Sequence, residues 1–239
     1  MAARFADTVA LIAGGTGALG SAVSRAFVQE GATVVVTHRS EAELAELTRS
    51  AAASKERLEG RRVDLSDEAA LADMTSAVVA RYGRIDILVN TVGGYAGGTP
   101  TWQAERSTLD HMLDLNVRVG HALLRAVVPV MLKQARGCIV NVAAKAALTH
   151  PAGAAAYAAS KAAALTMMGC LAAELLGTGV RANSVLPSTI DTEANRRAMP
   201  KADFSKWPKP DDIARVILFL CSRESQVIHG AEIPVYGQR

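Results

Sequence analysis

The sequence has few of the residues that mark metal-binding or disulfide-rich proteins. Only three cysteines occur among 239 residues, isolated at positions 138, 170 and 221. No spacing of cysteine or histidine is typical of a zinc site, and no disulfide framework is visible. We therefore expect no metal, and a reducing, cytoplasmic setting.

Strong net charge and uninterrupted apolar runs are also missing. The net charge is only +3, and no segment is rich in Lys and Arg, so no nucleic-acid partner is expected. The longest apolar segment, residues 152–176, is interrupted by Lys161 and Glu174. We expect a buried or interface helix there and no membrane span. The N-terminal run VALIAGG lacks a cleavage signature and is interpreted as a buried strand.

Short apolar runs alternate with segments of helical length along the chain. Strands are expected at residues 8–13, 32–38, 61–65, 85–90, 138–144, 180–187 and 232–237, and helices at 18–30, 41–53, 70–83, 103–135, 152–176 and 211–222. This order predicts a single α/β domain, residues 1–239, with a doubly wound parallel sheet and helices on both faces. Ligands bind such sheets at the carboxyl ends of the strands. The long irregular stretch from Pro187 to Pro210 is of a kind that usually covers a site or is mobile.

The first expected strand leads into the turn AGGTGALG, residues 13–20, and then into a helix. Glycines in such a turn let the backbone approach a pyrophosphate, and the helix N-terminus offers free N–H groups. A dinucleotide is therefore expected here; the alternative is a tight turn without a ligand. The predicted contacts are Gly14, Gly15, Thr16, Ala18, Leu19 and Gly20.

The second expected strand ends in THRSEAEL, without the acidic residue that NAD binders usually place there. Arg39 could grip a 2′-phosphate with paired donors, assisted by Ser40 or His38. NADP(H) is therefore favoured over NAD(H). The alternative is that Arg39 is a solvated surface residue.

Two further strand ends offer cofactor contacts. Asp64, followed by Leu65, could meet the adenine amine. Asn90 begins NTVGGYAGG, a glycine segment against which a flat ring can lie. Either residue could instead be a turn former.

Tyr157 and Lys161 stand four residues apart in an alanine-rich segment and therefore share one helical face. A nearby ammonium favours the phenolate and lowers the pKa of a tyrosine, ordinarily about 10. Such a pair could act as a general acid that protonates a substrate atom as hydride arrives. The alternative is an interface tyrosine beside a snorkelling lysine.

The ordered set of motifs resembles the short-chain dehydrogenase/reductase family over essentially the whole chain. The matching residues are Gly14, Gly20, Asp64, Asn90, Asn116 in DLNVRVG, Tyr157 and Lys161 in YAASK, and Pro187 in LPSTIDT. The resemblance implies a Rossmann fold in which Tyr157 donates a proton. It further implies that Lys161 binds ribose and lowers the tyrosine pKa, and that Asn116 holds a water in the proton relay.

The same resemblance implies further contacts and an assembly. Asn90 and Gly93 would line the adenosine side of the cofactor, and Ile190 and Thr192 would meet the carboxamide. A homodimer or homotetramer would form through the long helices, here residues 103–135 and 152–176.

Two positions depart from the family pattern. Ala18 replaces the middle glycine of the G-x-x-x-G-x-G turn. The family's substrate-orienting serine would fall in VAAKAAL, where this chain has Ala143 and Ala144, and the nearest hydroxyl is Thr149. Losing such a donor costs a carbonyl-reducing site about 3 kcal/mol of barrier. Lys145 could partly replace the serine, or it could be a solvated lysine.

The pattern without serine resembles one branch of the family, quinonoid dihydropteridine reductase. The similar stretches are GGTGALGS, VGGYAGG, AKAAL and the run from Thr192 to Trp207. A quinonoid dihydropterin is already activated, so a tyrosine need only supply a proton. That branch prefers NADH, which Arg39 contradicts. His150 and Trp207 could face the substrate, or they could be a solvent-facing and a packing residue.

The sequence therefore predicts an NADP(H)-dependent oxidoreductase that acts on a small carbonyl or a quinonoid, pterin-like substrate. The alternative is a non-catalytic NADP(H) sensor, because fold does not fix function. Intact Tyr157, Lys161 and Asn116 argue against the sensor. The expected partners are a small-molecule substrate and further copies of the chain, with no nucleic acid and no membrane.

Overall fold

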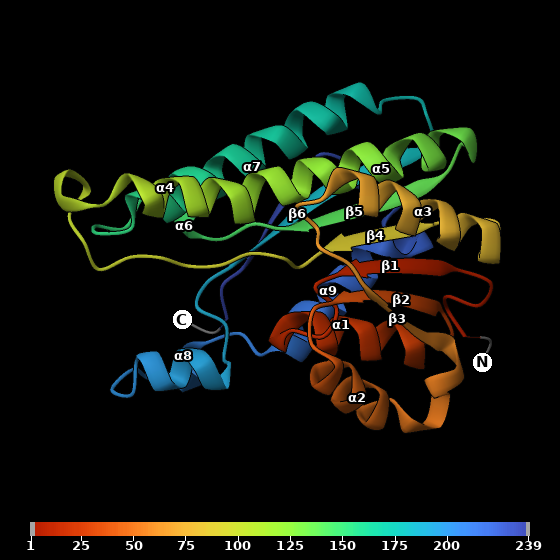
Figure 1. The fold of residues 1–239 in the computed structure, drawn as a ribbon, viewed down its shortest axis with the longest axis horizontal. Helices are drawn as coiled ribbons and strands as arrows, with labels where there is room; N and C mark the ends of the chain where they lie inside the picture. The colour runs from red at the N-terminus through yellow and green to blue at the C-terminus, as the bar shows by residue number, and fades with distance from the viewer. Residues whose placement is uncertain (1–2, 238–239) are drawn as a thin grey trace.

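The protein is described by a computed structural model that covers residues 3–237, within which seven parallel strands form one central sheet (Figure 1). In chain order the strands are β1 (Val9–Ala13), β2 (Thr33–His38), β3 (Leu58–Arg62), β4 (Ile87–Asn90), β5 (Gly137–Val142), β6 (Val180–Pro187) and β7 (Glu232–Val235). Their spatial order is β3-β2-β1-β4-β5-β6-β7, so the winding reverses between β1 and β4. The predicted doubly wound α/β fold is confirmed, and its switch point lies at the end of β1.

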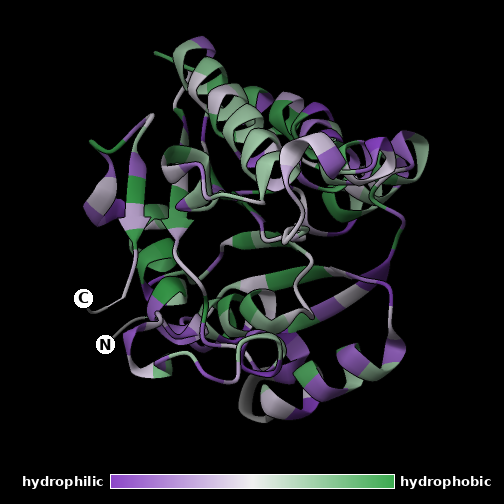
Figure 2. Ribbon diagram, turned by 90° about the vertical axis from the view of Figure 1, so that its left-hand side faces the viewer, coloured by the Kyte–Doolittle hydropathy of each residue, from purple (hydrophilic) through white to green (hydrophobic). Residues whose placement is uncertain are grey.

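Helices cover both faces of the sheet. They are α1 (Ala18–Gln29), α2 (Glu41–Ser50), α3 (Glu68–Tyr82), α4 (Arg106–Leu113), α5 (Val119–Lys133), α6 (Ala146–Thr149), α7 (Ala155–Glu174), α8 (Glu193–Ala198) and α9 (Pro210–Cys221). Ala10 and Ile12 of β1 pack toward α1 and α9 on one face, while Val9 and Leu11 pack toward α3, α5 and α7 on the other. Strands buried on both sides need apolar residues at every position, which explains the unbroken VALIA run (Figure 2).

The third strand begins three residues earlier than predicted. It spans residues 58–62, whereas the apolar pattern predicted residues 61–65. Its pairing with β2 runs from Val34 opposite Leu58 to His38 opposite Arg62, and it ends where β2 ends. Backbone pairing with β2, and not an apolar pattern, therefore determines where this polar edge strand begins and ends. The apolar Val63 lies just after the strand.

The stretch between Pro187 and Pro210 is more regular than predicted. It contains α8 and a 3₁₀ turn at Phe204–Lys206. Thr192 caps α8, because its hydroxyl accepts a hydrogen bond from the Asn195 N–H at 3.2 Å. The single-turn helix α6 was not predicted.

A continuous helical stretch of 28 residues, Arg106–Lys133, joins α4 to α5 through a π turn at Asp114–Arg118. By length and composition alone it could cross a membrane. Core helices of soluble proteins have the same properties, and α5 contributes Leu123 and Val127 to the core beneath the sheet. This feature alone therefore indicates little about a membrane.

Candidate active site

The turn between β1 and α1 depends on glycine at several positions. Gly14 has a φ of +71°. A Cβ on Gly20 would lie 2.1 Å from the Gly14 carbonyl oxygen, so the turn could not close around any other residue. The Thr37 hydroxyl on β2 accepts a hydrogen bond from the Gly14 N–H at 2.9 Å. No side chain caps the start of α1 at Gly17, so this turn fits the phosphates of a dinucleotide.

A groove of about 1050 Å³ extends from this turn along the carboxyl ends of the strands. The predicted cofactor residues that line it are Gly14, Thr16, Arg39, Ser40, Asp64, Leu65 and Gly93. Gly15, Leu19 and Gly20 are buried and shape the turn from within, whereas Ala18 is exposed at the start of α1. The groove also includes Thr91, whose hydroxyl donates to the Ala13 carbonyl at 2.7 Å. The sequence alone did not indicate Thr91.

Arg39 is exposed at the end of β2, and no carboxylate within residues 3–237 forms an ion pair with it. Hydrogen bonds from Ser66, followed by the charge of Arg39, lower the pKa of Asp64. An acid that the sequence did not place here also borders the groove, because the Thr16 hydroxyl donates to the Glu43 carboxylate at 2.9 Å.

The two residues expected to assist Arg39 have different environments. Ser40 lines the groove and caps α2, accepting from the Glu43 N–H at 3.3 Å. His38 is buried, and its Nδ1 atom has no hydrogen-bond partner within the described chain.

Asn116 and Lys161 converge at the loop that follows β4. The π turn places Asn116 so that its Oδ1 atom accepts from the Gly94 N–H at 3.0 Å. Its Nδ2 atom donates to the Ser160 hydroxyl at 3.0 Å. A Cβ on Gly93 would lie 2.8 Å from both Asn116 Oδ1 and Lys161 Nζ, so glycine is needed where these groups meet. π turns inside helices are frequent at functional sites.

Lys161 is 6% exposed, and its ammonium donates to the Val142 carbonyl at 3.0 Å. Burial lowers the pKa of Lys161 to about 8. Asn90, at the end of β4, is buried beside this cluster and donates to Asn141 Oδ1 at 3.0 Å. Asn90, Asn116 and Lys161, which were predicted from separate parts of the sequence, are therefore close together.

Tyr157, one helical turn before Lys161 on α7, is partly buried. Burial, followed by the neighbouring Tyr95, raises the pKa of Tyr157 to about 12. The prediction that Lys161 lowers this pKa is wrong for this structure, because removal of the phenol from water outweighs any attraction to the ammonium. The Tyr157 ring meets the Tyr95 ring edge-on, with centroids 5.0 Å apart.

The predicted substrate residues lie in the chain segments that follow β5 and β6. Ala144 is buried just beyond β5, and the Lys145 ammonium lies 4.9 Å from the centroid of the Tyr236 ring. His150 is exposed at the end of α6, and Trp207 packs against Phe204 with ring centroids 5.0 Å apart. Tyr95, and not Trp207, is thus the aromatic residue that contacts Tyr157.

The predicted contacts at and after the end of β6 are held by hydrogen bonds to their backbone carbonyls. The Pro187 carbonyl accepts from the Lys145 N–H at 2.8 Å, which joins the end of β6 to the start of α6. The Ile190 carbonyl accepts from Asn195 Nδ2 at 2.8 Å. This segment is therefore fixed next to the end of β5, with Thr192 at its far end.

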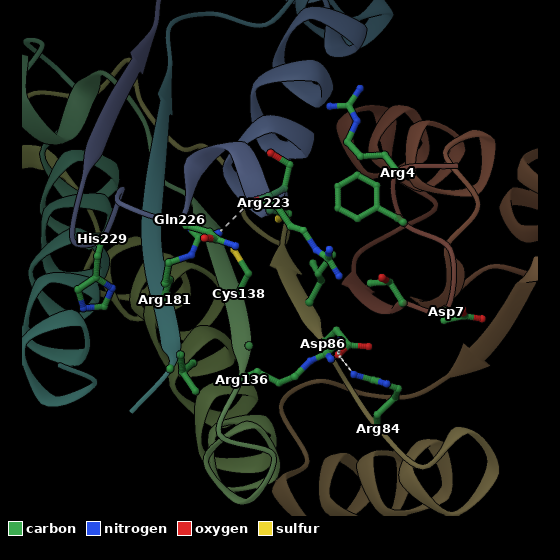
Figure 3. A pocket seen from close by; sticks show the side chains of 18 of the residues that line it. Arg4, Asp7, Arg84, Asp86, Arg136, Cys138, Arg181, Arg223, Gln226 and His229 are labelled. Carbon is green, nitrogen blue, oxygen red and sulfur yellow. Dashed lines mark hydrogen bonds and ion pairs between the residues drawn. The ribbon is translucent and has the colours of Figure 1, made fainter. Parts of the chain in front are cut away.

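A second cavity, of about 920 Å³, lies at the opposite, amino ends of the strands (Figure 3). Its lining is rich in arginine, and the side chains of Arg4, Arg84, Arg136 and Arg181 bond to other residues of the fold. Asp86 accepts from Arg84 at 2.6 Å, from Arg136 at 2.8 Å and from the Val9 N–H at 3.0 Å. Arg181 donates to the carbonyls of Leu220, Ser222, Ser225 and Ile228. The side chains that line this cavity therefore connect the ends of neighbouring strands to each other. None of the predicted site residues is among them.

The fold and the glycine groove together define a dinucleotide-binding α/β protein. Residues 8–203 match the family described as short chain dehydrogenase, so the chain belongs to the short-chain dehydrogenase/reductase family of oxidoreductases. No cluster of three or more His, Cys, Asp or Glu side chains that could hold a metal occurs within residues 3–237.

Individual relatives agree with this assignment. The chain is 32% identical to the 3-oxoacyl-[acyl-carrier-protein] reductase FabG of Thermotoga maritima, over 98% of each chain. Among solved structures it resembles an NAD⁺-bound xylitol dehydrogenase, with a TM-score of 0.90, 23% identity, and coverage of 98% of this chain and 99% of that one. It also resembles ElxO with NADP bound, with a TM-score of 0.90, 22% identity, and coverage of 96% and 97%. At these identities the two structures support the fold alone.

Proposed function

We propose that this chain is an NADP(H)-dependent oxidoreductase that transfers hydride to a small carbonyl or a quinonoid, pterin-like substrate, with Tyr157 as the proton donor. The observation that carries the proposal is the convergence of Lys161 and Asn116 at Gly93, with Tyr157 one turn away on α7. That cluster adjoins a groove suited to a dinucleotide. A non-catalytic sensor would have no use for this arrangement.

Each of the described site residues would have a separate role in such a reaction. The nicotinamide cofactor supplies the hydride when bound. The glycine turn and Arg39 would hold its phosphates, and Lys161 would hold its ribose. Tyr157, with a pKa of about 12, is protonated at neutral pH and so carries the proton that it would donate. Asn116 would position a water that returns a proton to the phenol.

Ala144 narrows the substrate class. It offers only a methyl group where family members have a serine hydroxyl. The negative charge that develops on the oxygen of a ketone would therefore be stabilised less. A quinonoid dihydropterin needs less stabilisation of this charge, because hydride addition restores a stable ring. This supports the proposal that the chain is one of the serine-less, dihydropteridine reductase-like members of the family. We also expect a cytoplasmic homodimer or homotetramer built through α4–α5 and α7.

The substrate class can be tested by following oxidation of NADPH and NADH with freshly generated quinonoid dihydropterin and with a panel of small ketones. We expect the dihydropterin to be turned over fastest, at rates well above a blank without enzyme. Turnover of ketones alone would contradict the pterin-like substrate. Absence of turnover with every acceptor would contradict the proposed function.

The cofactor preference depends on Arg39. Replacing Arg39 with alanine should weaken NADPH binding by about 10- to 100-fold, because one or two charge-assisted hydrogen bonds to the 2′-phosphate are lost. Binding of NADH, which lacks that phosphate, should not change. Fluorescence titration of both cofactors would measure the effect.

Arg49→Ala is the matched control, since Arg49 is exposed on α2 and pairs with Glu46. Equal weakening of both cofactors by Arg39→Ala, or of neither, would contradict a phosphate contact.

A further inference from the structure

The loop that follows β4 carries an aromatic residue to the edge of the active site. Tyr95 lies in the sequence GGYAGG, and its ring centroid is 5.0 Å from that of Tyr157 at an interplanar angle of 72°. Tyr95 is nevertheless 68% exposed. It therefore contacts the proposed proton donor on one side and remains accessible to a ligand on the other.

The position of Tyr95 is set by the same residues that build the site. Asn116 bonds both polar groups of Gly94, accepting from its N–H at 3.0 Å and donating to its carbonyl at 3.2 Å. Farther along, the Gly98 N–H donates to the Gly153 carbonyl at 2.9 Å, which ties the loop to the segment before α7. A Cβ on Gly97 would lie 2.2 Å from the Tyr95 hydroxyl, so glycine makes room for it.

Other polar groups near the end of β5 are already engaged. The Thr149 hydroxyl donates to the Lys145 carbonyl at 3.2 Å, and the Lys145 ammonium lies over the Tyr236 ring. The Ser160 hydroxyl donates to the Tyr157 carbonyl at 2.8 Å. By contrast, the Tyr95 hydroxyl makes no hydrogen bond to any other part of the described chain. It is therefore an uncommitted donor carried by the ring that contacts Tyr157.

We infer that the Tyr95 hydroxyl donates a hydrogen bond to the reacting oxygen or nitrogen of the substrate, in place of the donor that Ala144 cannot supply. The inference rests on the proposed function. Hydride adds to the substrate carbon, the π electrons move onto the heteroatom, and Tyr157 transfers its proton to that atom. Tyr95 keeps its proton throughout, and its hydrogen bond stabilises the negative charge as it develops.

Tyr95→Phe tests this role, because it removes the hydroxyl and keeps the ring against Tyr157. We expect kcat to fall by about 10²-fold, with KM and NADPH affinity little changed, since the bond strengthens only as charge develops. Adding Ala144→Ser to Tyr95→Phe should restore at least a tenth of the lost rate, because it returns a hydroxyl at the position where the family has its serine. Kinetics of both variants, with circular dichroism to confirm folding, would measure this.

Tyr82→Phe is the matched control and should leave kcat unchanged, because the Tyr82 hydroxyl bonds Glu59 at the far edge of the sheet. Wild-type kcat in Tyr95→Phe would overturn the inference, and so would a loss of rate that Ala144→Ser does not reduce. Turnover that survives Tyr157→Phe would instead overturn the proposed function, so the two failures are distinguishable.

Discussion

Replacing Tyr157 with phenylalanine should lower kcat by about 10²- to 10⁴-fold, the range over which a positioned general acid accelerates a reaction. The affinity for NADPH should not change, because the groove that would hold the cofactor is lined by other residues. The fold should also persist. Phenylalanine keeps the edge-on contact with Tyr95 and removes only a phenol whose burial is unfavourable when it is charged.

Steady-state kinetics together with a cofactor titration would separate these effects. Tyr82→Phe serves again as the control, since it removes a tyrosine hydroxyl far from the groove. A variant that loses cofactor binding along with turnover would indicate a structural role for Tyr157. A variant that turns over at the wild-type rate would show that another group supplies the proton.

The raised pKa of Tyr157 changes how the proposed proton donor works. A tyrosine whose pKa is lowered by an ammonium would be partly ionised and could serve as acid or base. Here burial is the larger influence, so the phenol keeps its proton up to a pH of about 12. The phenol therefore holds a proton at neutral pH, as a proton donor must, while its raised pKa makes it a weaker acid than an unperturbed tyrosine.

Much of the site could be predicted because the order of strands and helices fixes where side chains meet. Alternating apolar runs placed the glycine turn, Asn90 and the α7 residues at one edge of a parallel sheet. The spacing of Tyr157 and Lys161 was informative for the same reason, since a helix repeats every 3.6 residues.

Other features depend on contacts that no local pattern encodes. The π turn that turns Asn116 toward Gly94 is a one-residue irregularity within an otherwise regular helical pattern. The contact between Tyr95 and Tyr157 is made by a loop that hydrogen bonds to Gly94 and Gly98 hold in place. The sequence also predicted the wrong direction for the pKa of Tyr157, because proximity along a helix does not reveal how deeply each group is buried.

Replacing Lys161 with methionine should remove activity and at the same time make the protein more stable. The side chain is 6% exposed, and burial alone lowers the pKa of Lys161 from 10.5 to about 8. A shift of that size corresponds to about 3 kcal/mol of unfavourable free energy at neutral pH. Methionine has a similar length and carries no charge. Allowing about 1 kcal/mol for the lost hydrogen bond to Val142, we expect a net gain of about 2 kcal/mol in the free energy of unfolding.

The pH dependence of stability provides the decisive comparison. Below a pH of about 8 the lysine is charged in both the folded and the unfolded chain, so the folded chain carries the full unfavourable free energy of the buried charge. Between about 8 and 10.5 the folded chain holds fewer protons than the unfolded one, so this cost is relieved as the pH rises. Relative to wild type, the advantage of Lys161→Met should therefore shrink across that interval. Urea denaturation at several pH values would measure it.

Lys133→Met, on the exposed end of α5, is the matched control and should show no such trend. A Lys161→Met protein that is less stable than wild type at neutral pH would mean that the hydrogen bond to Val142 outweighs the buried charge. The stabilised variant that we expect would instead show that the fold retains this ammonium at a cost. Such a cost is understandable where the charge is needed to hold a cofactor beside Tyr157, and residues kept for function commonly lower stability in this way.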